Sequence, residues 1–230
     1  MKILIATGIY PPDIGGPATY SKYIFEEFSR RGEEVRVLVY TRITKGLPKG
    51  ISHFIYFLKV LKSARWADVI LTTDTISAGL PVYLASFFSA KPYVLKVGGD
   101  YVWEQAVQRW EVKELLDDFL KKKYRCQIQI MRSLQSHVAK NAAKVITPSK
   151  YLAATAEYWG VPENKISVIY NNVAIPAVVP SRREKILLFS FGRDVPWKGF
   201  SFLREIMPEI RKKFPDANLV AREVSREERD

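Results

Sequence analysis

Glycine-rich loops follow three of the strands that the sequence predicts, and each loop carries groups suited to binding anions or sugars. The first loop ends in Gly15 and Gly16, directly before a predicted helix. Free backbone N–H groups and the helix dipole attract an anion there, and the missing Cβ atoms let it approach closely. A turn that needs its glycines only for backbone geometry explains this loop equally well.

The second loop adds a carboxylate, Asp100, after Gly98 and Gly99. Asp100 could bind sugar hydroxyls or act as a general base. It could also be the N-cap of the helix that follows, and its position alone slightly favours that alternative.

In the third loop, Arg193 and Lys198 stand between a strand and a helix. An arginine fork and a lysine point charge at this spacing can grip a diphosphate, although a solvated basic loop would look the same. The two histidines lie far apart and lack metal-spaced partners, so no metal is expected. The single cysteine, Cys126, is interpreted as a small buried apolar residue.

Short apolar runs alternate with helical periodicity along the chain and must position these loops. Continuous rather than alternating apolar strands predict an α/β fold, a parallel sheet with helices on both faces. One predicted helix, residues 52–66, carries four apolar side chains on a single face: Phe54, Phe57, Leu58 and Leu61. Another is expected to span about residues 75–90, and strands are expected at residues 165–170 and 217–221.

The charge balance is strongly basic, with 36 Lys and Arg against 24 Asp and Glu, a net charge of +12. Such a protein attracts phosphates, nucleotides, acidic lipid or nucleic acid. A basic nucleic-acid-binding protein is therefore the weaker alternative, but no nucleic-acid-binding motif is present, so nucleic acid is not expected as a partner. A basic stretch without acidic residues begins at Phe119, and either a solvated helix face or contact with an anionic membrane explains it. The candidate membrane contacts are Lys121, Lys122, Lys123 and Arg125.

The sequence predicts neither a membrane span nor a signal peptide. Its longest nearly uncharged stretch, residues 76–90, contains Gly79 and Pro81 and is shorter than the roughly 20 apolar residues of a span. The first strand offers only a short apolar run. We therefore expect a cytoplasmic protein that can lie peripherally on the inner membrane face.

Three motifs, taken in order, resemble the retaining glycosyltransferases of family four, which have the GT-B fold of two facing Rossmann-like domains. The first is the loop Tyr-Pro-Pro-Asp-Ile-Gly-Gly-Pro, residues 10–17. The second, residues 144–173, is similar to the family's domain-boundary signature, and the third, residues 191–199, to the start of its donor-binding domain. The resemblance extends to about Leu219.

This resemblance implies four segments: an acceptor-side domain over residues 1–175, a linker at 176–184, a partial donor-binding βαβ unit at 185–221 and a polar tail at 222–230. It implies hexosyl transfer, with retention, from a nucleotide-sugar to a sugar, lipid-linked or polysaccharide-precursor acceptor, without a cofactor. Gly16, and less directly Gly15, would let a phosphate approach the helix. Arg193 and Lys198 would contact the donor diphosphate, and Asp100 lies near the place of an active-site histidine or aspartate in relatives.

The Glu-x7-Glu element that positions the donor in the family has no counterpart after Leu219. The chain is therefore expected to be inactive alone, as a truncated enzyme. The alternative is a non-catalytic or split subunit that needs a separate donor-domain chain. A lone βαβ unit cannot bury both faces of its sheet, so we also expect a homodimer through residues 185–221, or else a monomer whose unit packs on its own first domain.

Overall fold

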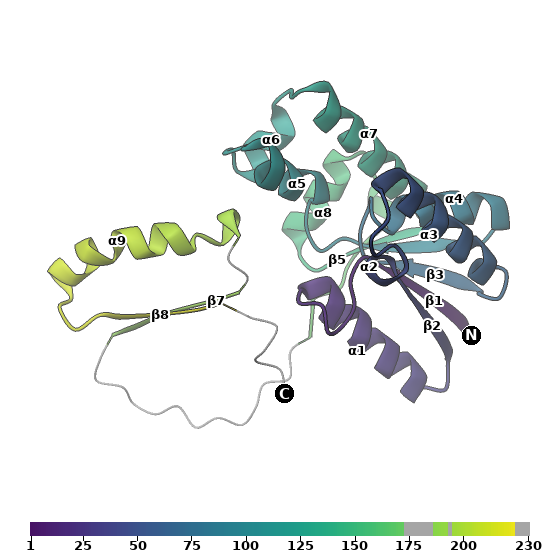
Figure 1. Cartoon of the computed structure of the whole chain (residues 1–230), viewed down its shortest axis with the longest axis horizontal. Helices are drawn as coiled ribbons and strands as arrows, with labels where there is room; N and C mark the ends of the chain where they lie inside the picture. Colours follow the sequence, from purple (N-terminus) through teal and green to yellow (C-terminus); the bar gives the residue numbers. More distant parts are fainter. Residues whose placement is uncertain (173–185, 193–194, 224–230) are drawn as a thin grey trace. The chain divides into compact units, whose positions relative to one another are not determined.

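The computed structural model describes residues 1–172, 186–192 and 195–223. The chain divides into two units, Met1–Asn171 and Asn172–Asp230, which are described separately (Figure 1). The predicted boundary after residue 175 and the predicted linker at 176–184 lie outside the described residues.

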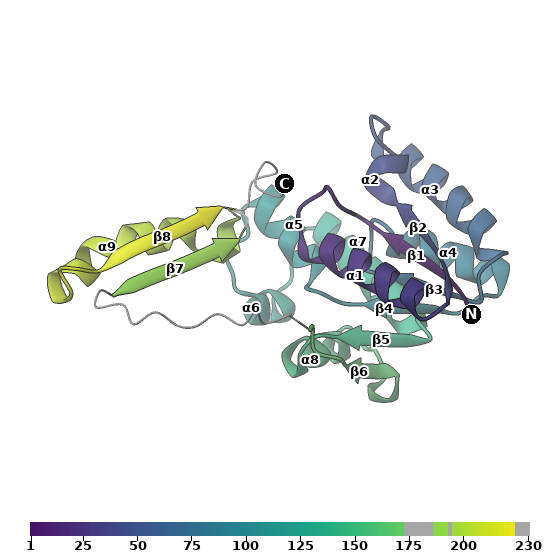
Figure 2. The ribbon, with the colours of Figure 1, turned by 90° about the horizontal axis from the view of Figure 1, so that it is seen from below.

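The first unit is built on a six-stranded parallel sheet in the order β2-β1-β3-β4-β5-β6 (Figure 2). The strands are β1 (Lys2–Thr7), β2 (Glu34–Val39), β3 (Val69–Thr72), β4 (Tyr93–Lys96), β5 (Lys144–Thr147) and β6 (Ile166–Val168). Ile5 lies between Val37 of β2 and Leu71 of β3, which places β1 inside the sheet. The continuous apolar runs that predicted a parallel sheet therefore lie where they were expected.

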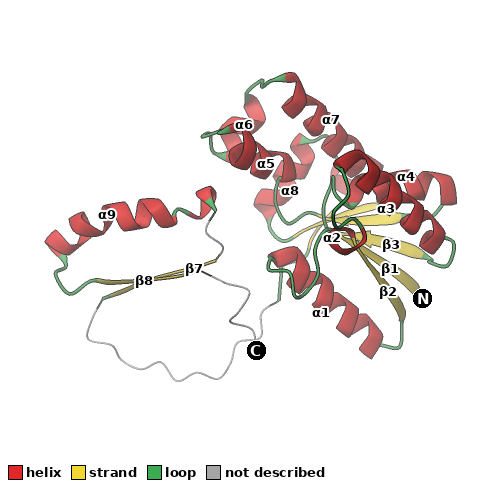
Figure 3. Cartoon of the chain, in the orientation of Figure 1, coloured by secondary structure: helices red, strands yellow, loops and turns green. Residues whose placement is uncertain are grey.

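Helices cover both faces of this sheet, which confirms the predicted fold class (Figure 3). The helices are α1 (Gly16–Arg30), α2 (Tyr40–Ile43), α3 (Lys49–Ala64), α4 (Gly79–Ser89), α5 (Tyr101–Trp110), α6 (Leu116–Lys121), α7 (Cys126–Asn141) and α8 (Lys150–Tyr158). Right-handed crossovers assign them to faces: the chain moves one way from β1 to β2 and the other way through β3 to β6. Accordingly, Ile3 and Ile5 pack against α1, while Leu4 and Ala6 face the larger core of the remaining helices.

Helix α4 begins at Gly79 rather than near residue 75, because the segment before it wraps around a carboxylate. The Oδ1 atom of Asp74 accepts hydrogen bonds from the backbone N–H groups of Ile76 at 3.0 Å and Ala78 at 2.9 Å. A Cβ at Gly79 would lie 2.2 Å from the carbonyl oxygen of Asp74, so only glycine fits this tight turn.

Two further expectations are corrected. Cys126 is exposed at the start of α7 rather than buried, because its helix turns its Ile128 and Val138 positions to the core. The predicted strand at residues 165–170 is shorter, since a 3-10 turn occupies Glu163–Lys165 and β6 ends at Val168.

The second unit has one crossover: β7 (Leu187–Gly192), the 3-10 turn η2 (Pro196–Lys198), α9 (Phe200–Lys213) and β8 (Asn218–Glu223). The two strands pair in parallel, with Phe189 opposite Val220. Phe200 and Met207 of α9 are buried. Strand β8 continues to Glu223, two residues beyond the strand end at residue 221 that the sequence predicted.

Candidate functional site

The order of the strands points to one edge of the first sheet. Strand β1 is where the direction of the crossovers reverses, and open α/β sheets bind ligands outside the carboxyl ends of the strands at such a switch point. The hydroxyl oxygens of Thr7 and Thr73 are 2.8 Å apart, which ties the ends of β1 and β3 together. The loops that follow these strands therefore start from a fixed base.

The two glycines at the start of α1 differ in what surrounds the place that a Cβ atom would occupy. A Cβ on Gly15 would lie 2.8 Å from Cδ1 of Ile9, so packing within the loop demands glycine there. A Cβ on Gly16 would meet no described atom within 4 Å. Gly16 thus borders open space at a helix N-terminus that has no side-chain cap and no acidic residue in its first turn. An anion would be attracted to this end of α1.

Lys96, at the carboxyl end of β4, brings a cation beside α1. The residue is only 5% exposed, and its Nζ lies 4.9 Å from the ring centroid of Tyr20 in the second turn of α1. Burial lowers the pKa of Lys96, since the charged amine is partly removed from water. Sequence reasoning missed this residue, although a lysine that ends an otherwise apolar strand is a detectable signal.

Asp74 is a second polar residue of this edge that sequence reasoning missed. Its Oδ2 lies 2.9 Å from the place that a Cβ at Gly8 would occupy, so the loops after β1 and β3 approach closely. Burial raises the pKa of Asp74, and the surrounding backbone N–H groups oppose that shift. Asp74 shapes the loop after β3 and places a carboxylate at the switch point.

Asp100 is the N-cap of α5, as the structural alternative predicted. Its Oδ1 accepts a hydrogen bond from the backbone N–H of Trp103 at 2.9 Å, and its Oδ2 accepts one from Nε1 of Trp159 at 3.1 Å. The residue is 2% exposed, and burial raises the pKa of its carboxyl group. This placement favours a positioning role over the predicted catalytic one, because both oxygens already have donors.

Gln135 of α7 connects the segment after β3 with the start of α5. Its Oε1 accepts hydrogen bonds from the hydroxyl of Thr75 at 3.0 Å and from the backbone N–H of Val102 at 3.3 Å. The loop after β3 and the first turn of α5 therefore share one buried polar network, which holds these two segments in place.

In the second unit, Arg193 lies outside the described residues, and Lys198 is placed. The Cε of Lys198 would lie 3.8 Å from a Cβ at Gly192, so the lysine side chain passes the carboxyl end of β7. Gly199 follows in the left-handed conformation, with φ 68°, and is the N-cap of α9. Lys198 thus lies between the end of β7 and the start of α9, as the sequence predicted.

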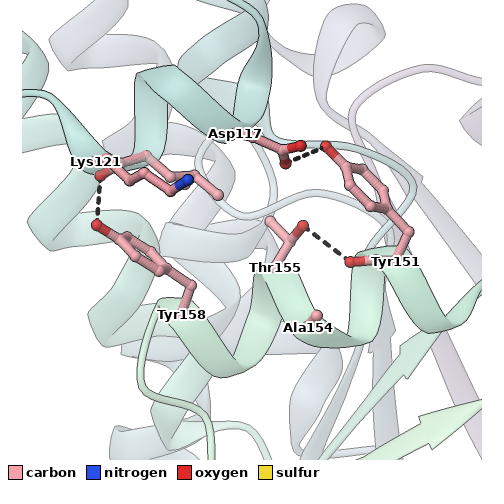
Figure 4. A pocket seen from close by; sticks show the side chains of 7 residues that line it. Asp117, Lys121, Tyr151, Ala154, Thr155 and Tyr158 are labelled. Carbon is pink, nitrogen blue, oxygen red and sulfur yellow. Dashed lines mark hydrogen bonds between the residues drawn. The ribbon is translucent and has the colours of Figure 1, made fainter.

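The basic stretch after Phe119 meets acidic neighbours in the folded protein. Lys122 forms an ion pair with Glu114, which raises the pKa of Lys122. Residues 111–118 contain four acidic side chains directly before the stretch. Lys121 lines a pocket of about 230 Å³ between α6 and α8, together with Asp117 (Figure 4). The positive charge of Lys121, Lys122, Lys123 and Arg125 is thereby partly balanced.

Tyrosines form much of that pocket's wall. The hydroxyl of Tyr151 donates to Oδ1 of Asp117 at 2.8 Å, and that of Tyr158 donates to the carbonyl of Leu120 (Figure 4).

Among the described residues, no cluster of three or more His, Cys, Asp and Glu side chains could hold a metal ion. In the same described part of the chain, no helix is long and apolar enough to cross a membrane.

Comparison with known families gives the site its context. The model of the glycosyl transferase 4-like domain matches residues 42–172, more than half of the chain. The chain belongs to this family. No curated protein matches it.

Solved structures share the fold of this glycosyl transferase 4-like chain at low identity. HepE from Anabaena, in complex with UDP-glucose, matches with a TM-score of 0.59 and 17% identity over 96% of this chain and 60% of that one. The lipopolysaccharide outer core galactosyltransferase WaaB matches with a TM-score of 0.60 and 15% identity over 95% and 60% of the two chains. The UDP-GlcNAc 2-epimerase from Methanocaldococcus jannaschii gives a TM-score of 0.54 at 14% identity over 98% and 66%. The chain thus spans about 60% of the length of the first two, and these matches support a GT-B fold.

Proposed function

We propose that this protein takes part in glycosyl transfer: hexosyl transfer, with retention, from a nucleotide-sugar to a sugar, lipid-linked or polysaccharide-precursor acceptor. The observation that carries the proposal is the carboxyl edge of the first sheet. There, an uncapped helix N-terminus, open space at Gly16 and the buried amine of Lys96 favour an anion. Family membership makes a sugar phosphate the fitting anion at this edge.

The two units divide the chemistry in this proposal. Lys198, with Arg193, contacts the diphosphate and stabilises it as the leaving group, which is electrostatic catalysis without a metal or cofactor. The edge of the first unit receives the acceptor and any phosphate it carries. Asp100 acts through position: it holds the start of α5 and the ring of Trp159.

A direct test titrates the purified chain with UDP, UDP-glucose and UDP-GlcNAc by calorimetry. Lys198→Ala is expected to weaken binding about tenfold or more, because a hydrogen bond to a charged group is worth roughly 1.5–3 kcal/mol. Lys213→Ala, at the far end of α9, is the matched control and should leave binding unchanged. Equal affinities for the two variants would contradict the assignment of Lys198.

The first unit is tested with inorganic phosphate and sugar phosphates as probes. Gly16→Ala should fill the open space and weaken binding, while the better helix propensity of alanine keeps the fold stable. Lys96→Met should remove the cation and keep the apolar contact with Tyr20. Phosphate binding that neither substitution changes would exclude this end of α1.

Measurements of activity distinguish the remaining alternatives for the function. With nucleotide-sugar and acceptor supplied, NMR of the product reads whether the anomeric configuration is retained. Transfer only after a separate donor-domain chain is added would favour the split-subunit alternative. Conversion of UDP-GlcNAc to its epimer would overturn the proposal, since epimerases share this fold.

A further inference from the structure

An exposed apolar surface lies on the side of α3 and α4 that faces away from the sheet. We call it the phenylalanine face, and define it by Phe54, Phe57, Leu58, Leu84, Phe87 and Phe88. Its four phenylalanine rings form a chain, with centroid distances of 6.4 Å between Phe54 and Phe57, 6.0 Å between Phe57 and Phe88, and 5.5 Å between Phe88 and Phe87. Phe54, Phe87 and Phe88 are 60%, 75% and 67% exposed.

This surface is additional to the core packing of its helices. Helix α3 turns another stripe inward, in which Tyr56, Val60 and Ala64 are fully buried. The buried residues of α4 are Gly79, Pro81, Val82 and Ala85. Isolated exposed apolar side chains are ordinary on protein surfaces, but a contiguous cluster of large ones marks an interaction surface.

A groove runs along the phenylalanine face. It encloses about 290 Å³ between α3 and α4, helices that pack side by side in both views of the fold (Figures 1 and 2). Its lining also includes His53, Leu80 and Pro81. The groove is thus almost wholly apolar, although it is open to solvent.

The segment that contains α3, and with it half of the phenylalanine face, carries charge of one sign. Residues 41–67 contain six Lys and Arg residues and no Asp or Glu. On α3, Lys62 and Arg65 follow Leu58 at i+4 and i+7, so they extend the same exposed side of the helix. Both are exposed. Long cationic side chains beside exposed aromatic rings are typical of helices that lie in a membrane interface.

We propose that the phenylalanine face docks on an anionic lipid bilayer, with its rings in the interface and its lysines and arginines at the headgroups. A second copy of the chain fits this surface less well, because a symmetric contact would bring the same cations against one another. The basic stretch around Lys122 fits a bilayer less well too, because Glu114 and the acidic residues of α6 adjoin it. The docking surface does not depend on the proposed glycosyl transfer.

The test measures co-sedimentation of the full chain with vesicles of phosphatidylcholine alone, and with phosphatidylserine added. We expect binding that requires phosphatidylserine and fades as salt is raised. The combined variant Phe54→Ser, Phe87→Ser, Phe88→Ser should bind about tenfold less or weaker, since interfacial binding scales with buried apolar area. Phe189→Ser with Phe191→Ser, exposed phenylalanines of the second unit, is the matched control and should bind as the parent does.

A charge series completes the design and does not depend on the folding of the serine variant. Lys59 is a third exposed cation of α3. Changing all three in the combined variant Lys59→Gln, Lys62→Gln, Arg65→Gln should lower binding to the mixed vesicles more than Lys121→Gln, Lys122→Gln, Lys123→Gln does. The reverse order, or equal sedimentation of the parent and the serine variant, would overturn the proposal. So would self-association in light scattering without vesicles that the three serine substitutions abolish, because the face would then be an interface between copies.

Discussion

The β1–α1 crossover and the β7–α9 crossover both lead from a parallel strand through a glycine-containing loop to a helix without a side-chain cap, but they obtain positive charge differently. In the first, the cation Lys96 comes from β4, about 80 residues along the chain, and is buried under Tyr20. In the second, Lys198 comes from the loop itself and lies along Gly192. The first crossover therefore receives its cation from another strand of the six-stranded sheet. The second carries its cation in its own loop.

The first strands of the two units, β1 and β7, also differ in how deeply they are buried. Residues 3–7 of β1 are all buried, because strands flank β1 on both sides and helices cover both faces. Strand β7 alternates between exposed and half-buried residues, because α9 covers one face of its two-stranded sheet. An apolar run therefore predicts a strand in both units, but its burial depends on elements elsewhere in the chain.

This contrast also explains what the sequence could predict. Alternating strands and helices, the N-cap alternative for Asp100 and the placement of Lys198 depend on local signals, and the structure confirms them. Lys96 and Asp74 join the site only through the order of the strands, which periodicity does not give. The face of α3 that carries Phe54 was visible as a stripe, but the stripe that packs on the core is the one with Tyr56.

The largest effect is expected where the first unit concentrates its polar network. Asp100→Ala removes the cap of α5 and leaves Nε1 of Trp159 buried without its acceptor. The two losses together should cost about 2–4 kcal/mol of unfolding free energy, read from urea titration. Lys198→Ala should leave the urea curve unchanged, because Lys198 lies in a loop of the second unit and takes no part in the buried polar network of the first. A loss below about 0.5 kcal/mol for Asp100→Ala would remove the distinction between the buried polar network of the first unit and the loop of Lys198 in the second.

A smaller effect is expected on the open face of the second unit. Phe189 and Phe191 are 62% and 60% exposed, and their rings stack at 6.3 Å. If residues 185–221 form a homodimer, as the sequence predicts, Phe189→Ser with Phe191→Ser should weaken self-association about tenfold or more in light scattering across a concentration series. Phe54→Ser with Phe88→Ser is the control from the first unit. A parent protein that remains a monomer at micromolar concentration would exclude the dimer.

The smallest effect is expected in the pH dependence of the unfolding free energy that the buried carboxyl of Asp100 causes. Burial raises its pKa in the folded protein, so the folded state binds the proton more tightly than the unfolded chain. The contribution of Asp100 to stability is therefore fully present below its unfolded pKa of about 3.9 and is lost as the pH rises through the folded pKa. Asp100→Asn cannot titrate, and other carboxylates affect both proteins equally. The unfolding free energy of the parent minus that of Asp100→Asn should thus increase as the pH is lowered from neutral toward 4, measured by urea titration at each pH. A difference that stays flat, or that decreases toward low pH, would mean that the donors from Trp103 and Trp159 outweigh burial at this carboxylate.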